Sequence, residues 1–335
     1  MVAALTGTVP LRSLQLGIEA TRGVAGAAQV ILPVLSVDAN PQYPVSKRVE
    51  QRGSLIKFYR APIVTGHMVS LGIEVIPTFE ESAYWFAMAL QGGITVATSA
   101  VTVKTRTYIP VATVDNLKTA TIEIVTDTQT YEVPFCVVNR LSFGWELGGP
   151  ATMQIDLLGQ KWDAVSATGA LSTLTSEEIN PATATAFIDT TTIGSTAALN
   201  VQSFNWTIDN GFVPLRAPNG NNYPVNFYRG EARSMSTSMV CDFDSTTEFA
   251  AHAAHTARKI RTKITGSTIA GSTGSVPRSI TTDWYGYHDE GPFSTADGKT
   301  QVRFSSESVY DSTATYDWSV AVATAAAAIA AVGES

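Results

Sequence analysis

The chain has 335 residues, of which 15% are charged, and a formal net charge of −7. A typical soluble domain is about 25% charged, so ionic side chains are scarce here, while Ser and Thr are abundant. A hydrophobic content of 44% is enough for a large core and excludes general disorder. A free-standing DNA-binding protein needs a basic face, and 22 Lys and Arg against 29 Asp and Glu argue against one. Low charge with many hydroxyls suits a surface that is covered by copies of the same protein.

Cysteine usage and targeting signals agree with this picture. Cys136 and Cys241 are too few for a disulfide framework and lack C-x-x-C spacing. We expect both to be buried free thiols in a protein assembled in a reducing cytoplasm. Residues 1–10 have no basic segment before an apolar run, so we expect no signal peptide. The most apolar stretch, 320–332, is shorter than the roughly 20 residues that cross a bilayer, and no membrane anchor is expected.

Strand patterns dominate the chain. Thr and β-branched residues alternate over 119–125 and again over 130–133, which predicts a hairpin with a turn at 127–129. Spacing and Gly or Asn punctuation favour an antiparallel sandwich or barrel over βαβ units. The other predicted strands are 54–59, 68–76, 101–109, 136–146, 151–158, 184–189, 201–209, 225–241, 279–287 and 301–322.

Two segments have helical patterns. Residues 79–90 follow Thr78, a predicted N-cap, have acids in the first turn and end before a Gly pair. Their aromatic residues lie on more than one side, which predicts a buried helix. A second helix is predicted over 245–260, beginning at Asp244 or Ser245 and ending at Arg258 and Lys259, whose charges suit the helix dipole.

An S-F-x-W motif occurs twice, at 142–145 and at 203–206. Each copy begins an alternating segment that closes on a Gly turn, and each is followed by another strand. We interpret the two as hairpin starts in two related sheets packed face to face. The alternative is a coincidence between two amphipathic strands.

Catalytic signatures are absent from the sequence: G-x-S-x-G, H-E-x-x-H and G-x-G-x-x-G after a strand do not occur. The glycine spacing of 266–273 is similar to a phosphate loop, but Ser272 stands where a Lys is needed, so a flexible loop is favoured. His252 and His255 with Glu248 could place zinc ligands on one helix face. A polar helix face is the favoured interpretation.

A sugar site is another alternative. Acids flank aromatic residues near Trp284, an arrangement found in carbohydrate-binding and hydrolytic sites. A strand end with a loop is favoured. The residues concerned are Asp283, Asp289, Glu290, Trp284, Tyr285 and Tyr287.

Basic residues gather in one short segment around 47–60. This pattern predicts either an extended arm that docks on an acidic surface, with charge matching setting its register, or a solvated loop. A nucleic-acid patch is less favoured because few aromatics accompany the bases. The residues are Lys47, Arg48, Arg52, Lys57 and Arg60.

Four segments point to a known family. Residues 16–25, LGIEATRGVA, are similar to a G-x-E-x-x-x-G start. The arm at 53–77 leads into a helix that ends in ALQGG at 89–93. Residues 127–141 contain YEVPFCVV in a hairpin, and Leu157-Leu158-Gly159 follows in the next strand. In these features the chain resembles the major tail tube proteins of long-tailed bacteriophages.

The resemblance implies a mainly β fold: a β-sandwich with one or two flanking helices, six copies per ring, and rings stacked into a hollow tube. Strands of the six copies would close into an inner β-barrel without exposed edges. The chain is then a single tail-tube domain, 1–335, assembled in the host cytoplasm and located in the virion tail. Its expected parts are an N-terminal arm (1–30), a hairpin arm (45–77), insertions (168–199 and 266–277) and a C-terminal arm (320–335).

The implied function is a structural conduit for DNA ejection, without catalytic residues, cofactors or metals. Its implied partners are itself, a tape measure protein, and tail terminator and distal tail proteins, while DNA passes without specific binding. Acids and hydroxyls are expected to line the lumen, and the basic segment is expected to contact neighbours. A carbohydrate-binding or hydrolytic β-sandwich and a major capsid protein stay as alternatives. The candidate lumen acids are Glu123, Asp127, Glu132, Glu146 and Asp156.

Overall fold

The computed structural model describes residues 13–325 except 48, 51–57, 60, 91–92, 101–102, 111–117, 170, 172, 175, 199, 219, 273–274 and 297. Within these residues the chain is mainly β, with two α-helices and a 3-10 helix. This confirms the expected sandwich-like class. The helices are α1 (Phe79–Ala89), α2 (Thr247–Ala253) and η2 (Pro181–Thr183).

The largest sheet divides at its longest strand, β12 (Thr130–Glu146). The C-terminal half of β12 pairs with β13 and β16 in what we call the long sheet. In spatial order the long sheet contains β3 (Ser36–Gln42), β8 (Met68–Val75), β13 (Thr152–Gly159), β12, β16 (Val201–Asp209), β19 (Ser234–Asp242), β23 (Lys299–Glu307) and β22 (Phe293–Ala296).

The N-terminal half of β12 pairs instead with a smaller group, which we call the side sheet. The change of partner coincides with Pro134, which cannot donate to a ladder, and with Phe135, whose φ is 55°. The side sheet contains β2 (Val30–Leu32), β1 (Ser13–Ile18), β11 (Ala120–Val125), β12 and β14 (Asp163–Val165).

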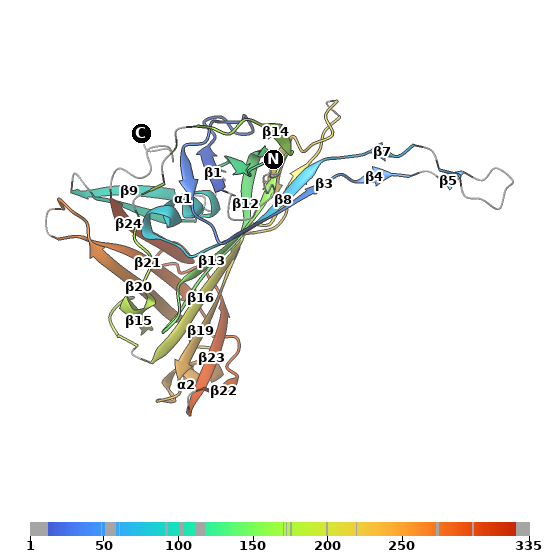
Figure 1. Cartoon of the computed structure of the whole chain (residues 1–335). Helices are drawn as coiled ribbons and strands as arrows, with labels where there is room; N and C mark the ends of the chain where they lie inside the picture. The colour runs from blue at the N-terminus through green and yellow to red at the C-terminus, as the bar shows by residue number, and fades with distance from the viewer. Residues whose placement is uncertain are drawn as a thin grey trace.

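A separate six-stranded sheet faces the long sheet, and α1 lies between the two (Figure 1). Every residue of α1 is buried. Phe86 contacts Phe143 and Trp206 of the long sheet, and the Tyr108 hydroxyl donates to the Ala83 carbonyl at 3.1 Å. The helix therefore joins both sheets in one core. The six strands are, in order, β15 (Ala184–Asp189), β20 (Arg258–Thr268), β21 (Pro277–Gly286), β24 (Trp318–Ala325), β10 (Val103–Ile109) and β9 (Gly93–Ala100).

Two-stranded ribbons complete the described elements. A hairpin lies between β16 and β19, and a long arm lies between β3 and β8 (Figure 1). The hairpin strands are β17 (Phe212–Leu215) and β18 (Asn226–Arg229). The arm contains β4 (Val45–Ser46) with β7 (Ile63–Val64), and β5 (Val49–Glu50) with β6 (Phe58–Tyr59).

The first predicted helix is confirmed, including its cap. Thr78 has an extended backbone, and its hydroxyl accepts from the Glu81 amide at 3.2 Å. The prediction of a second helix over 245–260 is wrong in its second half. After α2 the chain passes through His255, at φ 48°, and Arg258 begins β20. Alternating burial over β20 shows that a strand period overrides the helical one there.

The S-F-x-W prediction is also corrected. The two copies do not lie in facing sheets but on β12 and β16, which are antiparallel neighbours in the long sheet. Phe143 lies opposite Trp206, and Trp145 lies opposite Phe204. The motifs therefore form one cross-strand aromatic cluster, a common way of stabilising a sheet.

Several predicted strands have different boundaries. The predicted strand 225–241 is divided between β18 and β19, and 301–322 between β23 and β24. Residues 320–325 of the expected C-terminal arm lie within β24, paired on both sides. The expected insertion 168–199 contains η2 and β15, and 266–277 connects β20 with β21.

Candidate assembly and lumen surfaces

The long sheet buries one face and exposes the other. Along β13, Met153, Ile155 and Leu157 are buried, whereas the alternate residues Thr152 and Gln154 are exposed. The other strands repeat this period of two. The open face is mostly hydroxyl and amide. Its shallow central hollow is lined on this side by Asn205, Thr207, Ser236, Ser238, Ser305 and Glu307.

Carboxylates outnumber bases among the exposed side chains of this open face. Asp242 also lies on the sheet, but Lys299 contacts it at 3.0 Å and, with amide donors, lowers its pKa. The open face therefore carries a net negative charge at neutral pH. The exposed acids are Asp38, Glu74, Glu146, Asp156, Asp209 and Glu307, and the exposed bases are Arg140, Arg303 and Lys299.

The five predicted lumen acids do not lie together. Glu146 and Asp156 are exposed on the open face of the long sheet. Asp127 lies in the exposed β11–β12 turn, and Glu132 is half-buried on the side sheet. Asp127 and Glu132 therefore belong to the side sheet and lie apart from the open face.

Glu123 is corrected on burial. It is 2% exposed, and its carboxylate accepts from the Thr168 amide at 2.8 Å and the Thr168 hydroxyl at 2.5 Å. A buried, occupied carboxylate does not present charge to a lumen. Burial raises the pKa of Glu132, and the nearby Glu123 charge raises it further. The two carboxylates therefore influence each other on the side sheet. The β-branched alternation that predicted this strand correctly gave no sign that both of its faces are covered.

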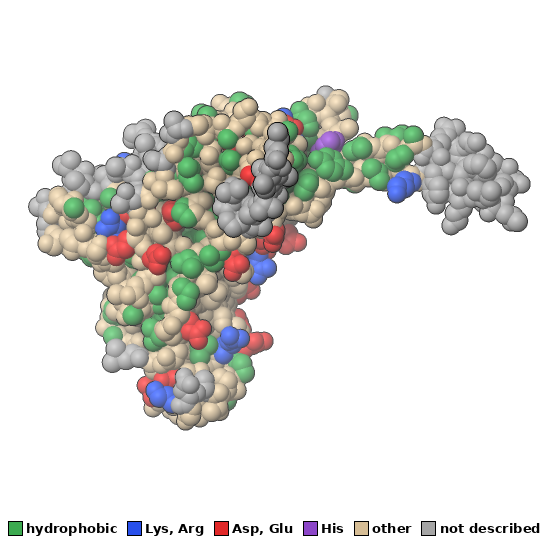
Figure 2. All heavy atoms as spheres, viewed as in Figure 1, with side chains coloured by type: hydrophobic (Ala, Val, Ile, Leu, Met, Phe, Trp, Pro, Cys, Tyr) green, Lys and Arg blue, Asp and Glu red, His purple; other side chains and the backbone are tan. Residues whose placement is uncertain are grey.

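The arm projects away from the sheets and carries apolar side chains along its described part (Figure 2). Ile63 is 70% exposed, and Tyr43, Val45 and Val64 are also exposed. Val45 and Val64 are cross-strand partners. An isolated two-stranded ribbon is marginal in water, and exposed apolar clusters mark interaction sites.

The base of the arm is fixed by the loop between β17 and β18. The His67 amide donates to the Asn222 carbonyl at 2.6 Å. The Arg216 guanidinium lies against Gly66, where a Cβ atom would fall 1.6 Å from its Nη1. The arm therefore leaves the body in a set direction.

The predicted basic residues lie on this arm only in part within the described chain. Lys47 is exposed just after β4. Arg48, Arg52, Lys57 and Arg60 lie outside the described residues. Their contact with a neighbour stays a prediction.

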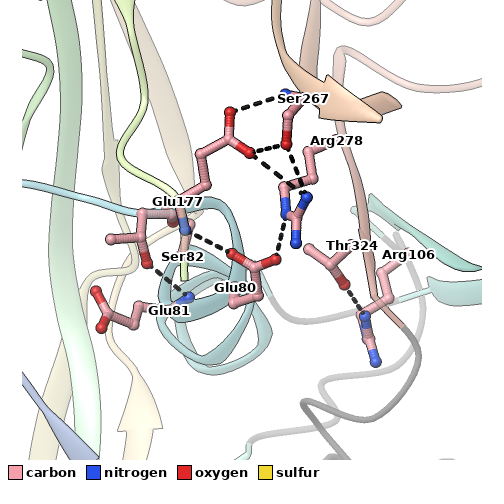
Figure 3. Close-up of polar contacts among 9 residues, drawn as sticks. Glu80, Glu81, Ser82, Arg106, Glu177, Ser267, Arg278 and Thr324 are labelled. Atoms are coloured by element: carbon pink, nitrogen blue, oxygen red, sulfur yellow. Dashed lines mark hydrogen bonds and ion pairs between the residues drawn. The ribbon is translucent and has the colours of Figure 1, made fainter. Parts of the chain in front are cut away.

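A charged network fastens α1 to the six-stranded sheet (Figure 3). Glu80 is 1% exposed, and Arg278 of β21 donates to it at 2.6 Å. Glu177 accepts from the Ser267 amide at 2.8 Å and lies 3.4 Å from Arg278. Burial raises the pKa of neighbouring Glu81. The Glu80 and Glu177 carboxylates are engaged with protein groups, so the network is structural, whereas Glu81 Oε1 is buried without a hydrogen-bond partner.

A family model described as phage tail tube protein matches residues 11–320. The chain belongs to the phage tail tube protein family. Among curated proteins, no relative matches it. The tail tube protein is thus a structural component of the virion tail.

The alternative sites of the tail tube protein are occupied by its own groups. Among the described residues, no cluster of His, Cys, Asp or Glu could hold a metal ion. His252 Nδ1 lies 2.7 Å from the His288 carbonyl. Asp283 accepts both bonds of a fork from Arg261, at 2.6 and 2.7 Å, and Trp284 is buried, so it offers a sugar no stacking surface.

The cysteines and helices add two observations about the tail tube protein. Cys136 and Cys241 are free and buried, as predicted. Burial raises the pKa of both thiols, so they stay protonated at neutral pH. None of the described helices is long and apolar enough to span a membrane.

Proposed function

We propose that this protein polymerises as closed rings stacked into the phage tail tube, through which DNA passes during ejection. The resemblance implies six copies per ring, each of which supplies a tube unit. The observation that carries the proposal is the arm: an apolar ribbon that projects from the body and finds no partner within the described chain. We propose that the arm binds a neighbouring ring. A contact between rings that repeats along one axis produces an open filament.

The open face of the long sheet supports the conduit. Its hydroxyls and amides are already solvated or paired, as in the 2.7 Å bond between the Ser142 and Thr207 hydroxyls. Its excess of carboxylates repels the DNA backbone. At physiological salt the Debye length is about 8 Å, so the repulsion acts close to the wall and keeps DNA from sticking. Glu146 and Asp156 are the predicted acids that we keep for this role.

The remaining partners follow from the resemblance. A tape measure protein would occupy the lumen during assembly, and terminator and distal tail proteins would bind the tube ends. Assembly in the host cytoplasm agrees with the two free thiols.

Charges placed on the arm test the proposal. Val45→Asp with Ile63→Asp puts two carboxylates on the apolar ribbon without touching the core. We expect a folded subunit with native circular dichroism that forms no long tubes by negative-stain electron microscopy. Val309→Asp, at a residue 46% exposed outside every expected arm, is the matched control and keeps tube formation. Tubes of normal length from the double variant would contradict the arm's role.

A further inference from the structure

The order of elements along the chain is repeated. In the first half, β1, β2, β3, the arm, β8 and α1 precede β11, β12, β13 and β14. In the second half, β15, a segment bridged to β15 at Ala197, β16, the β17–β18 hairpin, β19 and α2 precede β20, β21, β22, β23 and β24. The two halves of β12 correspond to β21 and β22. The β9–β10 hairpin has no counterpart and is an addition to the first half.

The hydrogen-bonded pairs repeat with the order, and all of them are antiparallel. In the long sheet, β3 with β8, β8 with β13, and β12 with β13 correspond to β16 with β19, β19 with β23, and β22 with β23. In the side sheet, β1 with β11, β11 with β12, and β12 with β14 correspond to β15 with β20, β20 with β21, and β21 with β24. Chance does not reproduce six pairings in sequence order.

Local details repeat as well. Glu19 follows β1 and accepts from the amide of Gly23 at 2.8 Å; Asp189 ends β15 and accepts from the amide of Gly194 at 2.7 Å. Both glycines have positive φ, 77° and 83°, so the same capped turn follows the first strand of each half. We call the halves the first repeat and the second repeat.

The registers show which residues are equivalent. Phe143 lies opposite Met153, which lies opposite Val75, the last residue of β8 before α1. Phe293 lies opposite Val302, which lies opposite Cys241, near the end of β19 before α2. Phe143 and Phe293 are therefore equivalent.

Helix contacts agree with that equivalence. The ring centroids of Phe86 in α1 and Phe143 are 6.1 Å apart, and those of Phe249 in α2 and Phe293 are 5.2 Å apart. The strand phenylalanine of each repeat thus packs against an aromatic residue of its own helix.

The two repeats meet inside the chain at one joint, where β12 pairs with β16. By the repeat, β22 is the counterpart of β12, and β3 is the counterpart of β16. These two strands are the edges of the long sheet, and within the described chain no strand pairs with their outer sides. The edge strand β22 is therefore equivalent to one strand of the β12–β16 pair, and the edge strand β3 is equivalent to the other.

The exposure of the equivalent phenylalanines fits an unfinished joint. Phe143 is 2% exposed because Trp206 of β16 covers it, with the two ring centroids 5.6 Å apart. Phe293 is 52% exposed at the free edge. A strand added beside β22 would cover it, and a large exposed aromatic on an unpaired edge is otherwise an aggregation hazard.

We infer that β22 of one subunit pairs, antiparallel, with β3 of a second copy, and that three chains close a ring of six tube units. The inference rests on the proposed function for the number of units. The register follows from the joint inside the chain, where Phe143 lies opposite Trp206 and Trp145 lies opposite Phe204. At the equivalent positions between two copies, Phe293 lies opposite Ala39, and Thr295 lies opposite Val37. The resemblance implies six copies of the chain per ring, whereas this inference gives three copies per ring, each with two tube units.

A designed disulfide tests the joint and counts the chains. We introduce Val37→Cys and Thr295→Cys together, and oxidise assembled tubes. Within one chain these strands lie at opposite edges, separated by roughly 30 Å at the usual strand spacing, so only neighbouring copies can be linked. Cys136 and Cys241 are buried and do not compete. We expect a non-reducing gel ladder that ends at three chains.

The matched control is Asp38→Cys with Thr295→Cys, in which the two side chains point to opposite faces of the sheet. It should assemble and remain unlinked. Tubes without cross-links, or a ladder that ends at six chains, would overturn the inference and leave the proposed function standing. A wild-type protein that forms no tubes would instead contradict the proposed function.

Wild-type tubes provide a second measurement that no variant can disturb. The mass of one ring should be three times the 35.6 kDa chain mass. A ring mass of six chains would overturn the inference even if the cysteine variant failed to fold.

Discussion

The two repeats share a framework but differ in what they add to it. Between the first two long-sheet strands, the first repeat carries the projecting arm, whereas the second carries the short β17–β18 hairpin. That hairpin folds back, and Phe212 and Phe227 pack on Phe135 and Val137. We infer that duplication allowed one copy of this connection to become a docking element. A ring of three chains would then have three arms rather than six.

The open face differs between the repeats in charge. Asp38, Glu74 and Asp156 of the first repeat correspond by register to Asn205, Val240 and Ser305 of the second. The first repeat therefore supplies much of the negative charge of the open face. In the proposed three-chain ring, the lumen would alternate between more and less acidic units.

The largest expected effects come from shortening the equivalent phenylalanines. Phe143→Ala creates a cavity in the core and should cost about 3–5 kcal/mol of unfolding free energy, measured by urea denaturation of the subunit. Phe293→Ala removes an exposed ring and should change subunit stability by less than about 1 kcal/mol. Its effect should appear in assembly, as a critical concentration raised about tenfold. Equal subunit destabilisation by both would contradict the unfinished joint.

Charge reversal on the open face has a smaller effect that concerns DNA rather than assembly. Asp156→Lys with Glu146→Lys exchanges two carboxylates for ammonium groups on exposed positions. We expect tubes of normal length, with DNA release from intact particles slowed and the slowing reduced by added salt. Asp127→Lys, on the exposed turn outside the long sheet, is the control and should leave release unchanged.

Reversal of the arm's bases is the next test. Arg48→Glu with Arg52→Glu should block polymerisation and leave a folded subunit, because the arm would carry repulsive charge to its docking surface. Lys299→Glu, beside Asp242 on the body, is a control that should still polymerise. Tubes of normal length from the arm variant, seen by electron microscopy, would contradict the assignment of these bases to contacts with a neighbour.

The smallest effect separates the two capped turns. Desolvation opposes ionisation of Asp189, but bonds from Ser195, Thr196 and Gly194 outweigh it and lower its pKa below 3.8. The stabilisation is therefore complete above about pH 4 and is lost as the pH falls through the folded-state value. Wild-type unfolding free energy should exceed that of Asp189→Asn at pH 6, with the gap narrowing at pH 3. A constant gap would contradict the role of the charge.

Much of the fold could be predicted from local patterns. The bounds of β16 and β15 follow from alternation alone, and α1 follows from Thr78 and its first-turn acids. The end of α2 could not be predicted, because His255 leaves the helix at positive φ without a Gly or Pro to mark it.

Long-range arrangement was less accessible. The sequence shows that the S-F-x-W motifs are related, but the pairing between β12 and β16 is a tertiary arrangement that periodicity does not encode. The duplication is hidden in sequence because the arm and the β9–β10 hairpin lengthen the first repeat and side chains at equivalent positions differ. Of the candidate lumen acids, Glu146 and Asp156 lie on exposed alternate positions, whereas Glu123 shows that alternation cannot tell a half-buried strand from one covered on both faces.

End-on imaging of assembled tubes by cryo-electron microscopy distinguishes a ring of three chains from a ring of six. We expect a ring with three-fold symmetry, in which six similar units alternate and three arms reach the next ring. Open faces of the long sheets should line the lumen, with β22 beside β3 at each chain boundary. True six-fold symmetry, with six chains and six arms per ring, would contradict it.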